Sequence, residues 1–185
     1  SELIEYYKGI YTTLSSCASR QLEEVTFRRA TISVPELMAT AGKYFRKVYK
    51  GNKAHIDFKI QPLEGRITGD WNQLRFLLEN LIDEACSVTL DGAVCLSARE
   101  DGEFIRFLFT DMRREKTREE LNQLFYPDLS RMTAGEKGEL YGTEYLVCKQ
   151  IIRDHDEFAG RRGCRINAEP AEGGGFTVYF TIPRR

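Results

Sequence analysis

The sequence lacks a surplus of charge of either sign. Its 27 lysines and arginines nearly balance its 28 aspartates and glutamates, and the formal net charge is -1. A protein whose main partner is a nucleic acid or an anionic membrane surface usually carries a strong excess of basic residues. The charge balance therefore supports neither partner, and we expect no nucleic-acid binding and no membrane contact.

Long apolar runs and organised cysteines are also missing. No stretch is hydrophobic over the roughly 20 residues that cross a bilayer, and the start has no apolar core of a secretion signal. The five cysteines have the spacing of neither a metal site nor a disulfide framework: Cys17, Cys86, Cys95, Cys148 and Cys164. Scattered thiols are typical of a reducing compartment, so the sequence predicts a cytoplasmic location. The first residue is Ser1 rather than methionine, which suggests a fragment of a larger protein.

The strongest periodic pattern runs from Gly69 to Thr89. Asp70 stands where a carboxylate can accept hydrogen bonds from the free N–H groups of a first helical turn. Asn80 and Glu84 lie one turn apart beside the apolar face and are therefore neighbours on the helix surface. We expect the functional site along this flank. Apolar residues recur at the spacing of a helix with one broad buried face, at Leu74, Leu77, Leu78, Leu81, Ile82 and Ala85.

The remaining patterns predict an α+β fold, a two-layer sandwich in which helices cover one face of a mixed sheet. A long loop is expected from Tyr126 to Tyr141, and a long amino-terminal helix from Glu2 to Arg29. The two apolar rows of that helix fit packing on the chain's own core and fit equally half of a helical hairpin in a dimeric bundle. Further helices are predicted over 33–50, 117–125 and 142–155, and strands over 31–34, 55–60, 66–68, 92–99, 104–110, 164–169 and 176–183.

Three segments resemble the sequence boxes of the ATP-binding catalytic domain of sensor histidine kinases, in the GHKL group with gyrase and MutL. DWNQLRFLLENLIDEACSVT is similar to the N box, FTDMRREKTREELNQLFYP lies over the box written DxGxG, and GTEYLVCKQIIRDH is similar to the later glycine box. The resemblance covers about residues 32–183. It implies a GHKL (Bergerat) ATP-binding fold over residues 31–185. It also makes residues 1–30 the second helix of a dimerisation hairpin, so a homodimer within a larger sensor protein is expected.

The resemblance implies which residues would hold Mg-ATP, and the sequence departs from the family among them. In the family, two asparagines one turn apart hold Mg²⁺ and the phosphates; here Asn80 is kept, but Glu84 takes the second place. Asp111, which in the family accepts a hydrogen bond from the adenine amino group, is retained. If the site is active, Asn80 and Glu84 are the expected metal ligands.

The glycines of the family's later boxes are largely replaced. Arg113 and Glu115 follow Asp111, and Glu144 stands for the second glycine of the box that keeps Gly142. Glycine lets the backbone approach a ligand closely, so long charged side chains should crowd the pocket or refill it. A carboxylate beside a phosphate also repels it, by roughly 4 kcal/mol for two unit charges about 4 Å apart near a protein surface.

Other charged residues are assigned ordinary roles. His55 and His155 are expected to be surface or packing residues rather than catalysts. Arginines and a lysine alternate with glutamates between Arg113 and Glu120, and this pattern favours a solvated helix face with i, i+4 ion pairs.

Together the four departures predict a degenerate, pseudokinase-like member that acts as a signalling and interaction module, with weak or no nucleotide binding and no bound cofactor. The alternative is an active sensor histidine kinase domain that binds ATP with Mg²⁺ and phosphorylates a histidine outside this chain. A third class is a structural scaffold with no trace of a pocket.

Overall fold

The computed structural model describes residue 4 and residues 27–127, 133–134 and 140–185. The expected amino-terminal helix from Glu2 to Arg29 is wrong at its end, because residues 27–29 are not helical and lead into the first strand. Apart from these residues and Ile4, that helix and its dimerisation role lie outside the described residues. Most of the expected loop from Tyr126 to Tyr141 also lies outside them.

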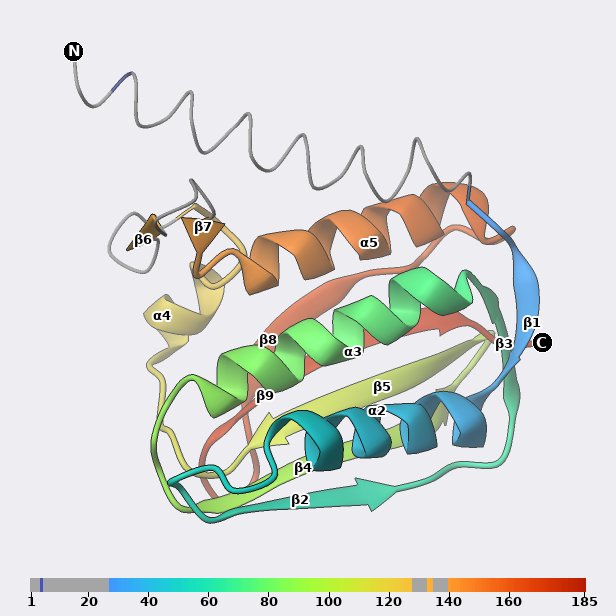
Figure 1. The fold of residues 1–185 in the computed structure, drawn as a ribbon. Helices are drawn as coiled ribbons and strands as arrows, with labels where there is room; N and C mark the ends of the chain where they lie inside the picture. Colours follow the sequence, from blue (N-terminus) through green and yellow to red (C-terminus); the bar gives the residue numbers. More distant parts are fainter. Residues whose placement is uncertain (1–3, 5–26, 128–132, 135–139) are drawn as a thin grey trace.

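Five strands form one mixed sheet, and three long helices lie side by side on one of its faces (Figure 1). Strand β2 runs parallel to β4, whereas the other neighbouring strands are antiparallel. This arrangement confirms the expected α+β sandwich. In order across the sheet, the strands are β2 (Ile56–Gln61), β4 (Gly92–Asp101), β5 (Phe104–Asp111), β9 (Phe176–Pro183) and β8 (Ile166–Pro170), and the helices are α2 (Val34–Val48), α3 (Trp71–Cys86) and α5 (Glu144–Phe158).

Four short strands and a short helix complete the described fold. β1 (Ala30–Ser33) pairs with β3 (Arg66–Gly69) as an antiparallel ribbon at one end of the sandwich. β6 (Thr133–Ala134) pairs with β7 (Leu140–Tyr141), and α4 (Arg118–Asn122) follows β5. In the described part of the chain, no helix is both long and apolar enough to cross a membrane.

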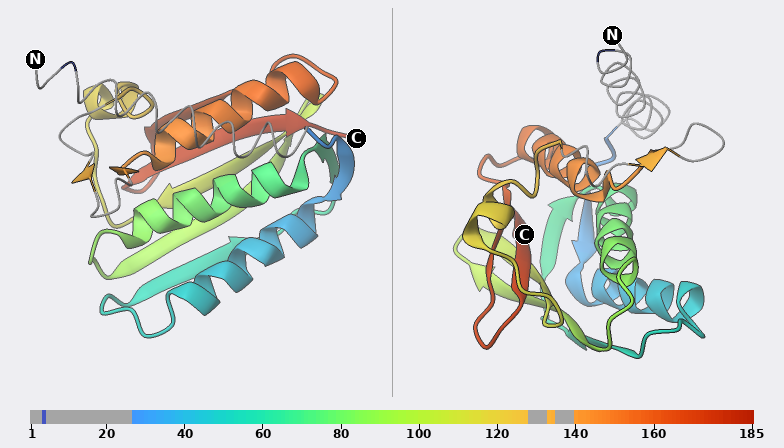
Figure 2. Two further views of the ribbon diagram at one scale, coloured as in Figure 1. Left: turned by 45° about the horizontal axis from the view of Figure 1, so that its top comes forward. Right: turned by 90° about the vertical axis from the view of Figure 1, so that its left-hand side faces the viewer.

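The hydrophobic core fills the space between the sheet and the three helices, which the end-on view of Figure 2 shows as two layers. The six predicted apolar positions of α3 are all buried, each at most 1% exposed. They face inward-pointing residues of the sheet, among which Phe107 stacks on Phe180 with ring centroids 5.0 Å apart. Because burying one large apolar side chain stabilises a fold by about 1.5–3 kcal/mol, this layer fixes α3 against the sheet.

Helix α3 is capped at its start by Asp70, and at its end Ser87 donates from its N–H to the Asp83 carbonyl group and from its hydroxyl to that of Glu84. The Asp70 carboxylate accepts a hydrogen bond from the Gln73 N–H, as predicted. The last turn contains Asp83 and Glu84 and no basic residue, which is unfavourable beside the negative end of a helix dipole. A positive group from another part of the chain would therefore stabilise this end of α3.

His155 is a packing residue of the core, as the sequence suggested. Its ring is fully buried, Nε2 accepts from the Asp70 N–H at 3.0 Å, and Nδ1 lies 2.8 Å from the Ile151 carbonyl oxygen. This pair of partners requires the neutral ring with its proton on Nδ1. Burial lowers the pKa of His155 from 6.5 to about 4.

This burial predicts a loss of stability on mild acidification. The unfolded chain binds a proton at His155 near pH 6.5, whereas the folded chain binds it only near pH 4. Stability is therefore fully present above pH 6.5 and decreases between about pH 6.5 and pH 4, by about 3 kcal/mol. Urea unfolding at a series of pH values measures this loss of stability. The His155→Gln variant should flatten the slope in this window, and His55→Gln, at an exposed position, should not. An equal slope in wild type and His155→Gln would contradict the assignment.

Candidate functional site

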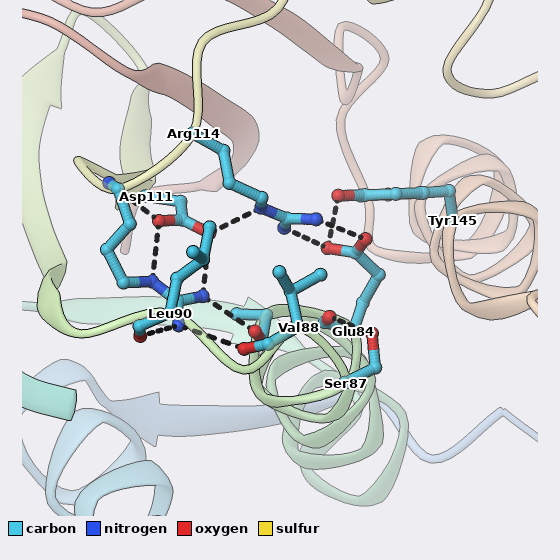
Figure 3. A network of polar contacts seen from close by, with 9 residues as sticks. Glu84, Ser87, Val88, Leu90, Asp111, Arg114 and Tyr145 are labelled. Atoms are coloured by element: carbon cyan, nitrogen blue, oxygen red, sulfur yellow. Dashed lines mark hydrogen bonds and ion pairs between the residues drawn. The ribbon is translucent and has the colours of Figure 1, made fainter. Parts of the chain in front are cut away.

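The candidate site lies where the ends of β5 and α3 meet the start of α5 (Figure 1). Asp111 is the last residue of β5, Glu84 is in the last turn of α3, and Tyr145 is in the first turn of α5. Figure 3 shows Asp111, Arg114, Glu84 and Tyr145 in one connected network. The fold thus brings together residues from three separate parts of the sequence.

The carboxylate of Asp111 is buried and fully engaged. Its Oδ1 accepts from the backbone N–H and the Nε–H of Arg113, both at 3.0 Å. Its Oδ2 accepts from Nη2 of Arg113 and from Nε of Arg114, both at 2.9 Å. A carboxylate offers about four acceptor positions, so these bonds use all of them.

The guanidinium group of Arg113 is equally saturated. Besides Asp111, it donates to the carbonyl oxygens of Ala85 at 2.6 Å, Val88 at 3.3 Å and Leu90 at 2.8 Å. An arginine has five N–H donors, and all five are used here. The side chains of Arg113 and Asp111 are only 1% and 2% exposed. Arg113 therefore supplies the positive cap that the end of α3 lacks.

Arg114 joins Asp111 to Glu84. It donates to Glu84 Oε1 at 3.2 Å and Oε2 at 2.8 Å, in addition to its bond to Asp111. The Tyr145 hydroxyl donates to Glu84 Oε2 at 2.5 Å. The two carboxylates and two guanidinium groups together carry no net charge, which favours their burial as a unit.

The protonation states follow from these contacts. Burial alone would raise the pKa of Asp111, but hydrogen bonds from Arg113 and the positive charge of Arg114 outweigh it and hold that pKa below its usual value. Burial, and then the charge of Glu84, raise the pKa of Tyr145 well above its usual value. Asp111 is therefore ionised and Tyr145 remains a hydrogen-bond donor at neutral pH.

Two expectations about the charged residues need correction. Arg113 and Arg114 do not belong to a solvated helix face, because α4 begins only at Arg118 and both side chains turn into the site. The Arg113 side chain instead lies buried between Asp111 and the end of α3. Glu84 does not present an unpaired negative charge, because Arg114 neutralises it.

The other predicted site residues lie around this network without joining it. Asn80 Nδ2 donates to the Phe76 carbonyl oxygen at 2.7 Å, one turn back on α3. Glu115 accepts from the Gly175 N–H at 2.9 Å. Gly142, with φ of +84°, precedes α5, and Glu144 is the first residue of that helix.

The turn between β8 and β9 touches the backbone of the site at Gly175. A β-carbon on this residue would lie 2.2 Å from the Asp111 carbonyl oxygen, and its φ is +84°, so only glycine fits. Through this close approach and the bond to Glu115, the turn fixes the end of β5.

Residues of the network that the sequence did not identify are Arg114, Tyr145 and the carbonyl groups of Ala85, Val88 and Leu90. The signal that could have found them was a pair of arginines two residues after the aspartate that ends a predicted strand, together with a helix that has acids but no base in its last turn. Which carbonyls an arginine reaches depends on the fold.

In this arrangement the residues do not fit a bound adenine, because no acceptor position of Asp111 is left for an amino group. Within the described ranges, no group of three or more histidine, cysteine, aspartate or glutamate side chains is placed to hold a metal ion.

Residues 69–185 match the family described as histidine kinase-, DNA gyrase B-, and HSP90-like ATPase. No match was found among curated proteins.

Several solved structures share the fold. The nucleotide-free catalytic domain of histidine kinase ThkA covers 85% of this chain and 96% of its own, with a TM-score of 0.65 and 18% identity. The mycobacterial sensor histidine kinase MprB covers 85% and 99%, with a TM-score of 0.62 and 16% identity. ThkA in complex with the response regulator protein TrrA covers 98% of this chain and 49% of its own, with a TM-score of 0.68 and 16% identity. At such identities the likeness shows the fold alone.

Proposed function

This chain belongs to the histidine kinase-, DNA gyrase B-, and HSP90-like ATPase family, and on that premise we propose that it is a degenerate, pseudokinase-like member. Its role is that of a signalling and interaction module in a larger sensor protein. The domain spans residues 31–185, and it binds neither ATP nor Mg²⁺ appreciably, because its own side chains occupy the place where the family holds the nucleotide.

The observation that carries this proposal is that hydrogen bonds from Arg113 and Arg114 occupy all acceptor positions of the Asp111 carboxylate. A nucleotide could use Asp111 only after the Arg113 guanidinium had left a position in which its side chain is 1% exposed. Breaking a buried ion pair by removing one partner costs about 3–5 kcal/mol. At about 1.4 kcal/mol for each factor of ten, nucleotide affinity would fall roughly 100- to 5,000-fold.

The closed site also explains how such a domain remains rigid without a ligand. Arg113 and Arg114 tie β5 to the end of α3, and Tyr145 ties α5 to Glu84. These contacts supply from within the chain what a bound nucleotide would otherwise supply between the same elements. A surface held in one shape is what an interaction module needs.

The proposed partners follow from the sequence and from the family. We place a homodimer contact in residues 1–30, whose apolar rows have the spacing of a paired helix. ThkA was solved with its response regulator, which makes a response-regulator-like domain the first partner class to test here. The free cysteines Cys86, Cys95, Cys148 and Cys164 support a cytoplasmic location. A single-chain mass in sedimentation equilibrium would rule out the homodimer.

Calorimetric titration of the chain with Mg-ATP and with a non-hydrolysable analogue tests the main proposal. We expect no measurable heat of binding in the micromolar range and no shift in the melting temperature at millimolar nucleotide. A ligand that binds only the folded state would raise stability by RT ln(1 + [L]/Kd), so the melting curve detects even weak binding.

Micromolar, Mg²⁺-dependent binding would contradict the proposal. If it came with transfer of the γ-phosphate to a histidine supplied on a separate peptide, the active-kinase alternative would replace it. An Arg113→Gly variant titrated in parallel serves as the comparison, because it removes the occupant and leaves Asp111 in place.

A further inference from the structure

Helix α2 carries a group of basic side chains that the balanced charge of the whole chain conceals. The residues between Glu36 and Asp57 include no aspartate or glutamate. We call the exposed lysines and arginine in the second half of α2 and directly after it the basic patch: Lys43, Arg46, Lys47, Lys50 and Lys53. Because the formal net charge of the chain is -1, the residues outside the basic patch together carry an excess of negative charge.

The basic patch lies on the side of α2 that faces away from the core. Lys43, Arg46 and Lys47 are three and four residues apart, so they share one side of the helix. Met38 and Ala41, on the other side, are buried. Figure 2 shows α2 at the border of the helix layer, beside α3. The basic side chains therefore reach into solvent from an outer border of the domain.

The acids on neighbouring elements have other partners. Glu79 of α3 forms an ion pair with Arg75 at 2.8 Å, and Asp57 of β2 lies 3.5 Å from the ammonium group of Lys59. Asp83 of α3 accepts hydrogen bonds from the hydroxyl groups of two tyrosines. Among the residues that the structure describes, none forms an ion pair with the basic patch. Its charges are therefore available to a partner.

The dipole of α2 explains only part of the basic patch. A positive charge in the last turn of a helix is favourable, which accounts for Arg46 and Lys47. Lys43 lies earlier in the helix and gains little, because this effect is confined to the last turn. Like charges three and four residues apart also repel each other. The unpaired positive charges thus destabilise the free domain slightly, and an approaching negative surface would relieve their repulsion.

The composition of the basic patch favours a diffuse negative surface over a specific protein interface. Four of its five members are lysines, whose compact and strongly hydrated ammonium groups act as point charges. Interfaces between proteins are instead enriched in arginine and aromatic residues and depleted of lysine. Val48 lies among these lysines and is 49% exposed. An apolar side chain at that place suits the boundary between lipid headgroups and acyl chains better than the backbone of a nucleic acid.

We propose that the basic patch is a docking surface for an anionic lipid bilayer, which meets the outer side of α2. Each lysine or arginine near such a surface strengthens binding roughly fivefold. The negative charge of the remaining surface orients the domain with the basic patch toward the bilayer. The balanced net charge indicated no membrane contact because it averages over both parts of the chain. The contact is peripheral, and it does not depend on whether the candidate site takes a nucleotide.

Flotation of the full chain with lipid vesicles tests this proposal. We expect binding at low salt to vesicles of phosphatidylcholine with about one-third phosphatidylglycerol, and none to pure phosphatidylcholine. Binding should be lost at about 0.5 M salt, which screens exposed charges. In the variant that combines Lys43→Gln, Lys47→Gln and Lys50→Gln, the binding constant should fall at least about tenfold. Circular dichroism first establishes that this variant is folded.

The matched control neutralises exposed arginines elsewhere and changes the net charge by the same amount, through Arg99→Gln, Arg118→Gln and Arg165→Gln. Its binding constant should remain close to that of wild type. Equal losses in the two variants would overturn the assignment to the basic patch. Absence of flotation with the mixed vesicles would overturn the membrane proposal, and retention on polyglutamate or on duplex DNA would then indicate an acidic protein or a nucleic acid as the partner.

A second measurement on wild type needs no variant. Acetylation of Lys43, Lys47 and Lys50, followed by mass spectrometry, should slow severalfold when the mixed vesicles are added. The reference is Lys59, whose side chain is 58% exposed and faces away from the helix layer, since its neighbour Phe58 stacks on a ring of α2. Its acetylation rate should not change. An equal response of all four lysines would overturn the proposal, whether or not the variants fold.

Discussion

Replacing Arg113 by alanine should lower the free energy of unfolding by about 3–5 kcal/mol. The reason is that one side chain satisfies two needs. Its positive charge compensates the buried negative charge of Asp111. Its N–H groups also donate hydrogen bonds to three carbonyl oxygens at and beyond the end of α3. Without Arg113, the three carbonyl groups and the Asp111 carboxylate lose these hydrogen bonds while still partly shielded from water, and a buried polar group without a partner destabilises the fold. Domains of this kind are usually stable by only 5–15 kcal/mol, so the loss would be a large fraction.

Urea unfolding of wild type and variant measures this effect, and Arg99→Ala is the matched control. Arg99 is exposed on β4, and its loss should change stability by less than about 0.5 kcal/mol. The double variant Asp111→Asn, Arg113→Ala should be less destabilised than the sum of its single changes, since the uncompensated charge is then absent. Guanidinium ion at low concentration should partly restore Arg113→Ala. If Arg113→Ala lowered the free energy of unfolding no more than Arg99→Ala does, the bonds of the Arg113 guanidinium group would not stabilise the fold.

Restoring the family's residues at the four departures should recover nucleotide binding. The variant combines Glu84→Asn, Arg113→Gly, Glu115→Gly and Glu144→Gly. We expect Mg-ATP affinity at least tenfold above wild type, a gain of about 1.4 kcal/mol. The physical reason is that the changes free the Asp111 carboxylate and remove carboxylates from positions where phosphates bind in the family. Circular dichroism and the melting temperature first establish that the variant is folded.

The structure shows that this variant retains one obstacle. Arg114 also donates to Asp111, and without Glu84 it loses its second partner and can remain against the carboxylate. Adding Arg114→Ala should therefore raise the affinity further. Titration calorimetry compares the two variants with wild type and with Arg99→Ala. If neither folded variant binds better than wild type, the pocket differs from that of the family in more than these side chains.

The periodicity of the sequence predicted most of the helices and strands correctly, because the spacing of apolar residues along each segment marks the face that is buried. The six apolar positions of α3 are those that the three- and four-residue spacing marks, and Asp70 caps the helix as expected. The turn around Gly102, whose φ is +60°, joins β4 and β5 as predicted. The parallel pairing of β2 with β4 was not predicted, because no turn connects the two strands and the sequence pattern of a strand does not reveal its neighbour.

For the candidate site, the sequence identified Asp111, Arg113 and Glu84 as the positions where the chain departs from or keeps the family pattern. It did not show how they pair. Arg113 and Arg114 were assigned to a solvated helix face, because charges of alternating sign along a helix usually indicate a face that is exposed to solvent. In the fold, the strand ends at Asp111 and the chain turns before α4 begins, so both guanidinium groups point inward.

The sequence by itself determined which residue types stand at the positions where the family holds its ligand. It also determined most of the helices and strands, because these depend on the pattern of neighbouring residues along the chain. Only the tertiary structure decided that three of them, Glu84, Asp111 and Arg113, are joined in one network through Arg114. The partners of Arg113 come from Asp111 and from carbonyl groups more than twenty residues earlier. A buried charge must find its partners across the fold, and their distance and direction are set by how α3 packs on the sheet.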